Sequence, residues 1–131
     1  MKIDIKILCI LLALFTTSAM AQNQTEHASL AGSWVGALVI GQASLDMSFT
    51  ITVQDGIYSA AFISRQMGIY GMPAESMVVN NNRITIRLEL LAAEYTGRIR
   101  MDKSGSVIAF IDGEWFQEGE MVPVILRRPK E

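Results

Sequence analysis

The stretch SLDMSFTITV, residues 44–53, decides the fold class. Its apolar residues stand at every second position, and polar residues fill the positions between them. Successive side chains of a β-strand point to opposite faces, so this segment predicts a strand with one dry face and one wet face. The stretches RITIRLEL, residues 83–90, and EYTGRIRM, residues 94–101, repeat the pattern. The alternation therefore predicts an all-β protein.

Short turn signals separate the predicted strands, among them Asp55-Gly56 and the three asparagines at 80–82. Such residues tolerate the positive φ of tight hairpins. Five further apolar segments bring the total to about eight strands, and no connection is long enough for a parallel crossover. We expect an antiparallel meander that curls into a small barrel, because closure removes unpaired strand edges. The aromatic residues stand within strands rather than in girdles at strand ends, which argues against a membrane barrel.

The first 21 residues have the features of a secretory signal peptide. Two lysines lie near the start, residues 7–15 form an apolar run, and Ala19-Met20-Ala21 has the small-x-small pattern of a cleavage site. The apolar run is shorter than the about 20 residues that a membrane-spanning helix needs. We therefore expect cleavage after Ala21 and an exported protein, periplasmic or extracellular, that does not span a membrane.

The expected mature chain is acidic. The whole chain carries 11 basic and 13 acidic side chains, and the loss of Lys2, Lys6 and Asp4 leaves a net charge of −3. This balance predicts no basic patch for nucleic acid. The only cysteine, Cys9, leaves with the signal, so no disulfide or thiolate ligand is expected. We expect a polar lead-in at 22–31 and a single barrel domain at 32–129, held together by its core.

Neither a metal site nor a catalytic group is predicted. The single histidine, His27, lies in the lead-in, without a second histidine or a cysteine to form a zinc site. No nucleophile elbow is present. Four acidic residues near the chain end lack the fixed spacing of a calcium loop, and we interpret them as a solvated rim: Asp112, Glu114, Glu118 and Glu120. The sequence therefore predicts a protein that is not an enzyme and has no cofactor.

The order of several short motifs resembles a β-domain found in bacterial secreted proteins. Along the chain these motifs are GSWVGAL (32–38), GIY (56–58), SRQMGIYGMP (64–73), YTG (95–97), GEWFQEG (113–119) and PVILRR (123–128). In that family the domain precedes an α/β-hydrolase domain and looks lipocalin-like. The resemblance implies a lipocalin-like barrel and a hydrolase-associated domain, which we expect here without the hydrolase. One departure is that Arg65-Gln66-Met67 replaces the Pro-Asp-Gln centre usual in the family.

The two tryptophans, Trp34 and Trp115, each follow a glycine by two positions. The resemblance implies that Trp34 covers one barrel end, with an arginine of the last strand, Arg127 or Arg128, packed on it. Such stacking contributes about 0.5–2 kcal/mol. We interpret these four residues as structural closure. The alternative is a site on which the ring of a ligand stacks.

The stretch RQMGIYGMP, residues 65–73, predicts an exposed loop with two pliable glycines. Its residues Met67, Tyr70 and Met72 are candidates for contact with a ligand or partner, because Met-rich surfaces adapt to apolar molecules. The alternative is a loop that folds over the barrel mouth as a plug.

Two functions remain open on the sequence alone. The first is a non-catalytic interaction module for an unknown exported protein or surface glycan. The second is a small lipocalin-like carrier of an apolar ligand. An eight-stranded barrel holds either packed side chains or one small ligand. The bulky inward candidates favour the packed interior and hence the module, since a cavity would forfeit their burial: Met47, Phe49, Tyr58, Phe62, Ile84, Ile86, Tyr95 and Trp115.

Overall fold

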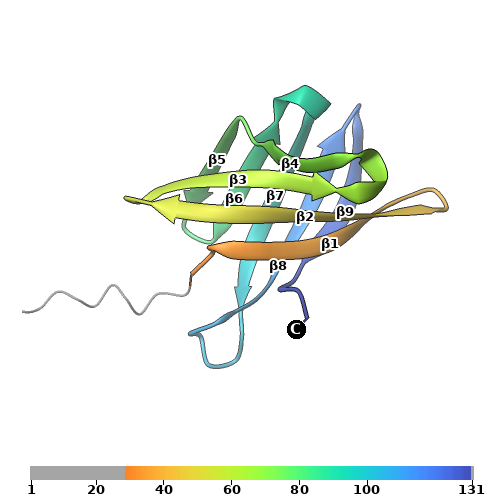
Figure 1. The fold of residues 1–131 in the computed structure, drawn as a ribbon. Helices are drawn as coiled ribbons and strands as arrows, with labels where there is room; N and C mark the ends of the chain where they lie inside the picture. Colours follow the sequence, from red (N-terminus) through yellow and green to blue (C-terminus); the bar gives the residue numbers. More distant parts are fainter. Residues whose placement is uncertain (1–28, 131) are drawn as a thin grey trace, which may run out of the picture.

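The computed structural model describes residues 29–130, which form two antiparallel β-sheets. Figure 1 shows the four-stranded sheet in front, crossing the five-stranded sheet behind it. The first sheet contains β1 (Gly32–Ile40), β2 (Ala43–Gln54), β3 (Ile57–Ser64) and β4 (Ile69–Pro73). The second contains β5 (Ser76–Asn80), β6 (Arg83–Leu88), β7 (Ala93–Met101), β8 (Ile108–Gln117) and β9 (Glu120–Leu126). Two short 3₁₀ helices, η3 (Arg65–Met67) and η4 (Glu89–Leu91), follow β3 and β6.

The prediction of an all-β, antiparallel meander is confirmed, since every strand pairs with its sequence neighbour within each sheet. The structure has nine strands rather than about eight, because β4 forms where the sequence predicted a loop. No closed barrel is found among residues 29–130: the strands divide into two sheets. A single pair, Val35 and Arg127, joins β1 to β9, through N–H···O bonds of 2.7 and 2.8 Å.

The strand β2 shows how the alternating pattern produces the sandwich. Met47, Phe49 and Ile51 are buried, while the polar residues between them face outward. Val53, which the pattern places on the dry face, is exposed. The reason is that β1 begins at Gly32, opposite Ile51, so the last part of β2 extends beyond β1.

The β2–β3 hairpin follows the turn chemistry of the sequence. Asp55 and Gly56 form its two-residue loop, with φ values of 54° and 77°. Positive φ at both central residues is the geometry whose twist matches that of the flanking strands. The register that results pairs Phe49 with Phe62, and both rings are buried.

The reversal after β6 differs from the prediction. The strand ends at Leu88, two residues earlier than expected, and η4 with Ala92 turns the chain so that Leu88 pairs with Ala93. Ala92 takes the left-handed conformation, with φ of 49°. Leu90, predicted on the dry face, is instead 81% exposed on η4.

The core lies between the two sheets and is built around packed aromatic rings. Phe49 lies 5.4 Å from Phe62 and 5.7 Å from Tyr95, measured between ring centroids. Phe62 in turn lies 5.3 Å from Trp115 of the other sheet. Such tilted pairs stabilise by more than their buried area alone. The aromatic rings thus join the sheets through the middle of the molecule.

Two glycines make room for Tyr95. Gly97 and Gly113 stand opposite each other in β7 and β8, and a Cβ at Gly113 would overlap the Tyr95 phenol. The phenol hydroxyl donates a 2.9 Å hydrogen bond to the Val124 carbonyl of β9. A larger residue at Gly113 would displace the ring that links three strands of the sheet.

Candidate interaction surface

The join between the first and last strands is built on Trp34. The indole is fully buried, and its Nε1 donates a 2.9 Å hydrogen bond to the Leu30 carbonyl. The guanidinium of Arg128 lies over the ring, 3.9 Å from its centroid. Gly32, with φ of 114°, leaves the space that this guanidinium occupies, since a Cβ there would lie 2.8 Å from the Arg128 Nη1.

Arg128 is fixed by more than the indole. Its two terminal nitrogens donate to the carbonyls of Ser33 and Ser29, at 3.3 and 3.0 Å. Partial burial lowers the pKa of this guanidinium. Arg127, the other arginine named from the sequence, faces the opposite side of β9 and lies 4.9 Å from the ring of Phe110. The structure therefore brings Arg128, and not Arg127, onto Trp34.

Trp115 lies in a different environment from Trp34. Its Nε1 donates to the Gln117 Oε1 at 3.1 Å, and the Gln117 Nε2 donates to the Leu91 carbonyl of η4 at 2.9 Å. The ring is buried against Phe62. Although both tryptophans follow a glycine by two positions, Trp34 lies at the join of β1 and β9, whereas Trp115 lies beneath η4.

The three contact candidates of the sequence lie on η3 and β4, not in the predicted loop. The hydrogen bonds between β3 and β4 order this segment as a strand, with a register shift after Phe62. Met67 and Met72 are half-buried and pack against the core. Tyr70, which pairs with Ile63, is 73% exposed. Of the three, only Tyr70 presents most of its surface to solvent.

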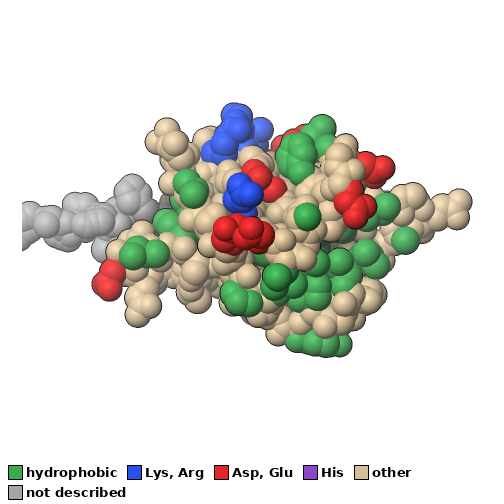
Figure 2. All heavy atoms as spheres, turned by 90° about the horizontal axis from the view of Figure 1, so that it is seen from above, with side chains coloured by type: hydrophobic (Ala, Val, Ile, Leu, Met, Phe, Trp, Pro, Cys, Tyr) green, Lys and Arg blue, Asp and Glu red, His purple; other side chains and the backbone are tan. Residues whose placement is uncertain are grey.

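Further exposed apolar residues lie around this end of the molecule, and sequence reasoning missed them. Leu90 lies on η4, while Phe116 and Met121 pair across the β8–β9 hairpin and are both exposed. Figure 1 places η3, η4 and the β8–β9 turn toward the upper right of the view, and Figure 2 shows exposed hydrophobic side chains on this end from above. We call Tyr70, Leu90, Phe116 and Met121 the exposed apolar end.

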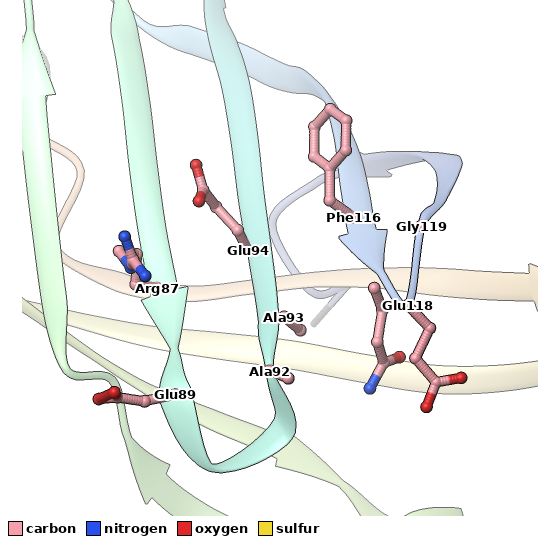
Figure 3. Close-up of a pocket in the computed structure, with 9 residues that line it drawn as sticks. Arg87, Glu89, Ala92, Ala93, Glu94, Phe116, Glu118 and Gly119 are labelled. Atoms are coloured by element: carbon pink, nitrogen blue, oxygen red, sulfur yellow. The ribbon is translucent and has the colours of Figure 1, made fainter.

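A shallow hollow of about 490 Å³ lies beside Phe116 on the outer face of the five-stranded sheet. Arg87, Glu94 and Phe116 form one row across β6, β7 and β8, and Figure 3 shows the last two projecting from neighbouring strands. Glu89 and Glu118 add two carboxylates. Arg87 lies 3.8 Å from Glu75, in an exposed ion pair. The hollow presents surface charges of both signs.

The acidic residues near the chain end are dispersed. Asp112 and Glu114 project from the outer face of β8, Glu118 lies in the β8–β9 turn and Glu120 begins β9. Asp112 lies 3.8 Å from the Arg100 Nη2. Among residues 29–130, no three His, Cys, Asp or Glu side chains come close enough to hold a metal ion.

The most perturbed phenol is that of Tyr95, whose pKa is raised above its ordinary value of about 10. Burial is the main cause, and the negative charges of Asp112 and Glu114 add to it. Because the hydroxyl already donates to the Val124 carbonyl, this phenol is a neutral structural group in the fold. Its position in the packed core gives it no access to a substrate.

The predicted signal peptide at 1–21 and His27 lie outside the described residues. No helix within 29–130 is long and apolar enough to cross a membrane. Comparison of the chain with protein-family models, with curated proteins and with solved structures gave no match.

Proposed function

We propose that the chain is an exported, non-catalytic interaction module that binds a partner protein through its exposed apolar end. The observation that carries the proposal is the exposure of Tyr70 on β4 and Leu90 on η4, at 73% and 81% of their surfaces. Exposed apolar surface that groups on one side of a soluble protein commonly marks an interaction site. Tyrosine is also among the residues enriched at the centre of such sites.

The packed interior supports the module over the alternative, a small lipocalin-like carrier of an apolar ligand. A carrier needs a cavity between the sheets, where Phe49, Phe62 and Trp115 pack against one another. Burial of each of these side chains contributes roughly 1.5–3 kcal/mol. The chain would lose that stabilisation if a ligand-sized space replaced them.

The sequence supports the remaining parts of the proposal. The signal-like segment at 1–21 supports export, and the motif order supports kinship with the lipocalin-like β-domain that accompanies secreted hydrolases. Two sheets joined at one residue pair are compatible with a flattened barrel of that kind. In this function the module binds a separate exported protein, and the apolar character of the surface favours a protein over a glycan.

Site-specific photo-crosslinking in the producing cell tests the proposal. A photoreactive amino acid replaces Tyr70 or Leu90 in two variants and Ile57 in a third. Ile57 is the matched control, since it is 70% exposed but lies at the tip of the β2–β3 hairpin, at the far left of Figure 1. We expect one crosslinked species of the same mass from positions 70 and 90, and none from position 57.

Crosslinks of equal strength from all three positions would contradict the proposal, because they would reflect exposure alone. The carrier alternative has its own test, the native mass of protein purified without detergent. An uncharged apolar molecule retained in that protein, together with absent crosslinks at 70 and 90, would favour the carrier.

A further inference from the structure

A second surface feature is a groove of about 730 Å³ on the outer face of the molecule, across the join between the two sheets. Its floor follows the strand register: Arg127, the residue after β9, pairs with Val35 of β1, Val35 with Ser48 of β2, and Ser48 with Ile63 of β3. Three members of this row belong to the neighbouring strands β1, β2 and β3, and the fourth directly follows β9. The groove therefore exists only where β1 and β9 meet.

The floor of the groove is partly apolar. Val35, Ala37, Ile63 and Ile125 line it with aliphatic side chains that point away from the core. Ser64 borders the groove, but it is buried and alternates with the outward-facing Ile63, so its hydroxyl lies on the core side of β3. The apolar character of the floor therefore comes from the four aliphatic side chains.

The charges around the groove are strongly unequal. Its lining holds four cations and one carboxylate, namely Arg65, Arg127, Arg128, Lys130 and Asp46. Within the described chain, none of the four cations lies within ion-pair distance of a carboxylate. This excess stands in a chain whose formal net charge is −2. Arg128 is already held by Trp34 and two backbone carbonyls, so Arg65, Arg127 and Lys130 are the cations that remain for a ligand.

The cations stand on two sides of the floor. Arg65 begins η3, which is held beside β2 by a 3.1 Å hydrogen bond from the Asp46 N–H to the Gln66 side chain. Arg127 directly follows β9, and Lys130 lies three residues further along the chain. A ligand on the apolar floor would therefore have a cation within reach on either side.

We propose that this groove binds a small organic anion, a molecule with a short apolar body and one carboxylate or phosphate group. Charge complementarity selects the anion, and the aliphatic floor selects the apolar body. The volume lies within the about 300–1,000 Å³ of typical small-molecule sites. The groove adjoins the exposed apolar end at Ile63, which pairs with Tyr70, but none of the four residues of that end lines it, so the proposal does not depend on the proposed function.

Titration with octanoate, followed by the backbone amide NMR signals of the whole mature chain, tests the proposal. Octanol, which has the same chain length without the charge, and acetate, which has the charge without the chain, are the reference probes. We expect saturable shifts with octanoate at Val35, Ser48, Ile63 and Arg127. The two reference probes should give much weaker shifts at the same amides.

Charge variants test the role of the cations. Arg65→Gln and Lys130→Gln should each weaken octanoate binding about two- to five-fold, the usual effect of one exposed charge pair. Lys103→Gln, in the β7–β8 loop outside the groove, is the matched control and should leave binding unchanged. All three variants remove an exposed charge, and their circular dichroism should match that of the parent.

Three results would overturn the proposal. The first is equal binding of octanol, which would show that the cations contribute nothing. The second is a set of shifts centred on the core or on the exposed apolar end. The third is the absence of any saturable shift with octanoate. Octyl phosphate, titrated in the same way, decides between the two anionic groups if octanoate binds.

Discussion

Truncation of Trp34 to alanine tests whether the join between β1 and β9 holds the fold together. The variant removes a fully buried indole, its hydrogen bond to Leu30 and the surface on which Arg128 lies. Truncation of a buried tryptophan typically costs about 3–5 kcal/mol. The cation on the ring accounts for about 0.5–1 kcal/mol of that loss. The expected cost is a large share of the about 5–15 kcal/mol by which a small domain is stable.

The assay is equilibrium unfolding in urea, followed by circular dichroism and by the fluorescence of Trp115, the other tryptophan of the chain. With a slope of about 1–3 kcal/mol per molar for a small protein, the midpoint should fall by at least about 1 M. Tyr70→Ala is the matched control, because it also removes an aromatic ring but from an exposed position. Its effect should stay within about 0.5 kcal/mol.

The reasoning is refuted if Trp34→Ala unfolds at the same urea concentration as Tyr70→Ala. A second comparison isolates the stacked cation. Arg128→Met keeps an apolar stem but removes the charge, and should cost about 0.5–1 kcal/mol. The same change should have a clearly smaller effect when Trp34 is already alanine, because contacting residues are not additive. Full additivity would show that the guanidinium does not stabilise the fold through the indole.

Three further predictions concern other parts of the chain. Gly113→Ala should cost about 1–3 kcal/mol or more in a thermal melt, because its Cβ overlaps the Tyr95 ring. The raised pKa of Tyr95 means that its contribution to stability is complete below about pH 10 and is lost as the pH rises above that value. In the Tyr95→Phe variant the urea midpoint should therefore fall less steeply as the pH rises in alkaline buffer. If the midpoint of the variant falls with pH as steeply as that of the parent, this phenol is not the cause. Cleavage after Ala21 should give an exported chain whose intact mass corresponds to a start at Gln22. A mass that includes residues 1–21 would contradict this prediction.

The alternating runs were sufficient to predict most strands because burial on one face requires a period of two. The strand β4 was missed for a physical reason. Its five residues include Gly71, with φ of 126°, and end in Pro73, so the segment has the composition of a turn. Its pairing depends on β3, with which it forms the edge of the sheet. The chain reversal at η4 was missed because Ala92 takes a positive φ without a glycine or asparagine to signal it.

The residues of the candidate site were harder to predict than the strands. The stretch MVPVIL in β9 is apolar on both faces, so its pattern does not tell which of Arg127 and Arg128 points toward Trp34. The structure decides this through the Val35–Arg127 pair, which turns Arg127 outward. The sequence pattern also does not show which residues form the exposed apolar end. Leu90 is an apolar residue in an alternating run, which predicts a buried position. It is exposed because β6 ends at Leu88, two residues before it.

The contact between Arg128 and Ser33 spans 95 positions of the sequence. Ordering so long a loop is entropically costly, and contacts of this kind are among the last to form during folding. Without Arg127 and Arg128 there is no guanidinium over Trp34 and no groove across the join. Completion of the fold therefore waits for the C-terminal end of the chain. If the protein crosses a membrane during export, the join between β1 and β9 cannot form until the last strand has passed through.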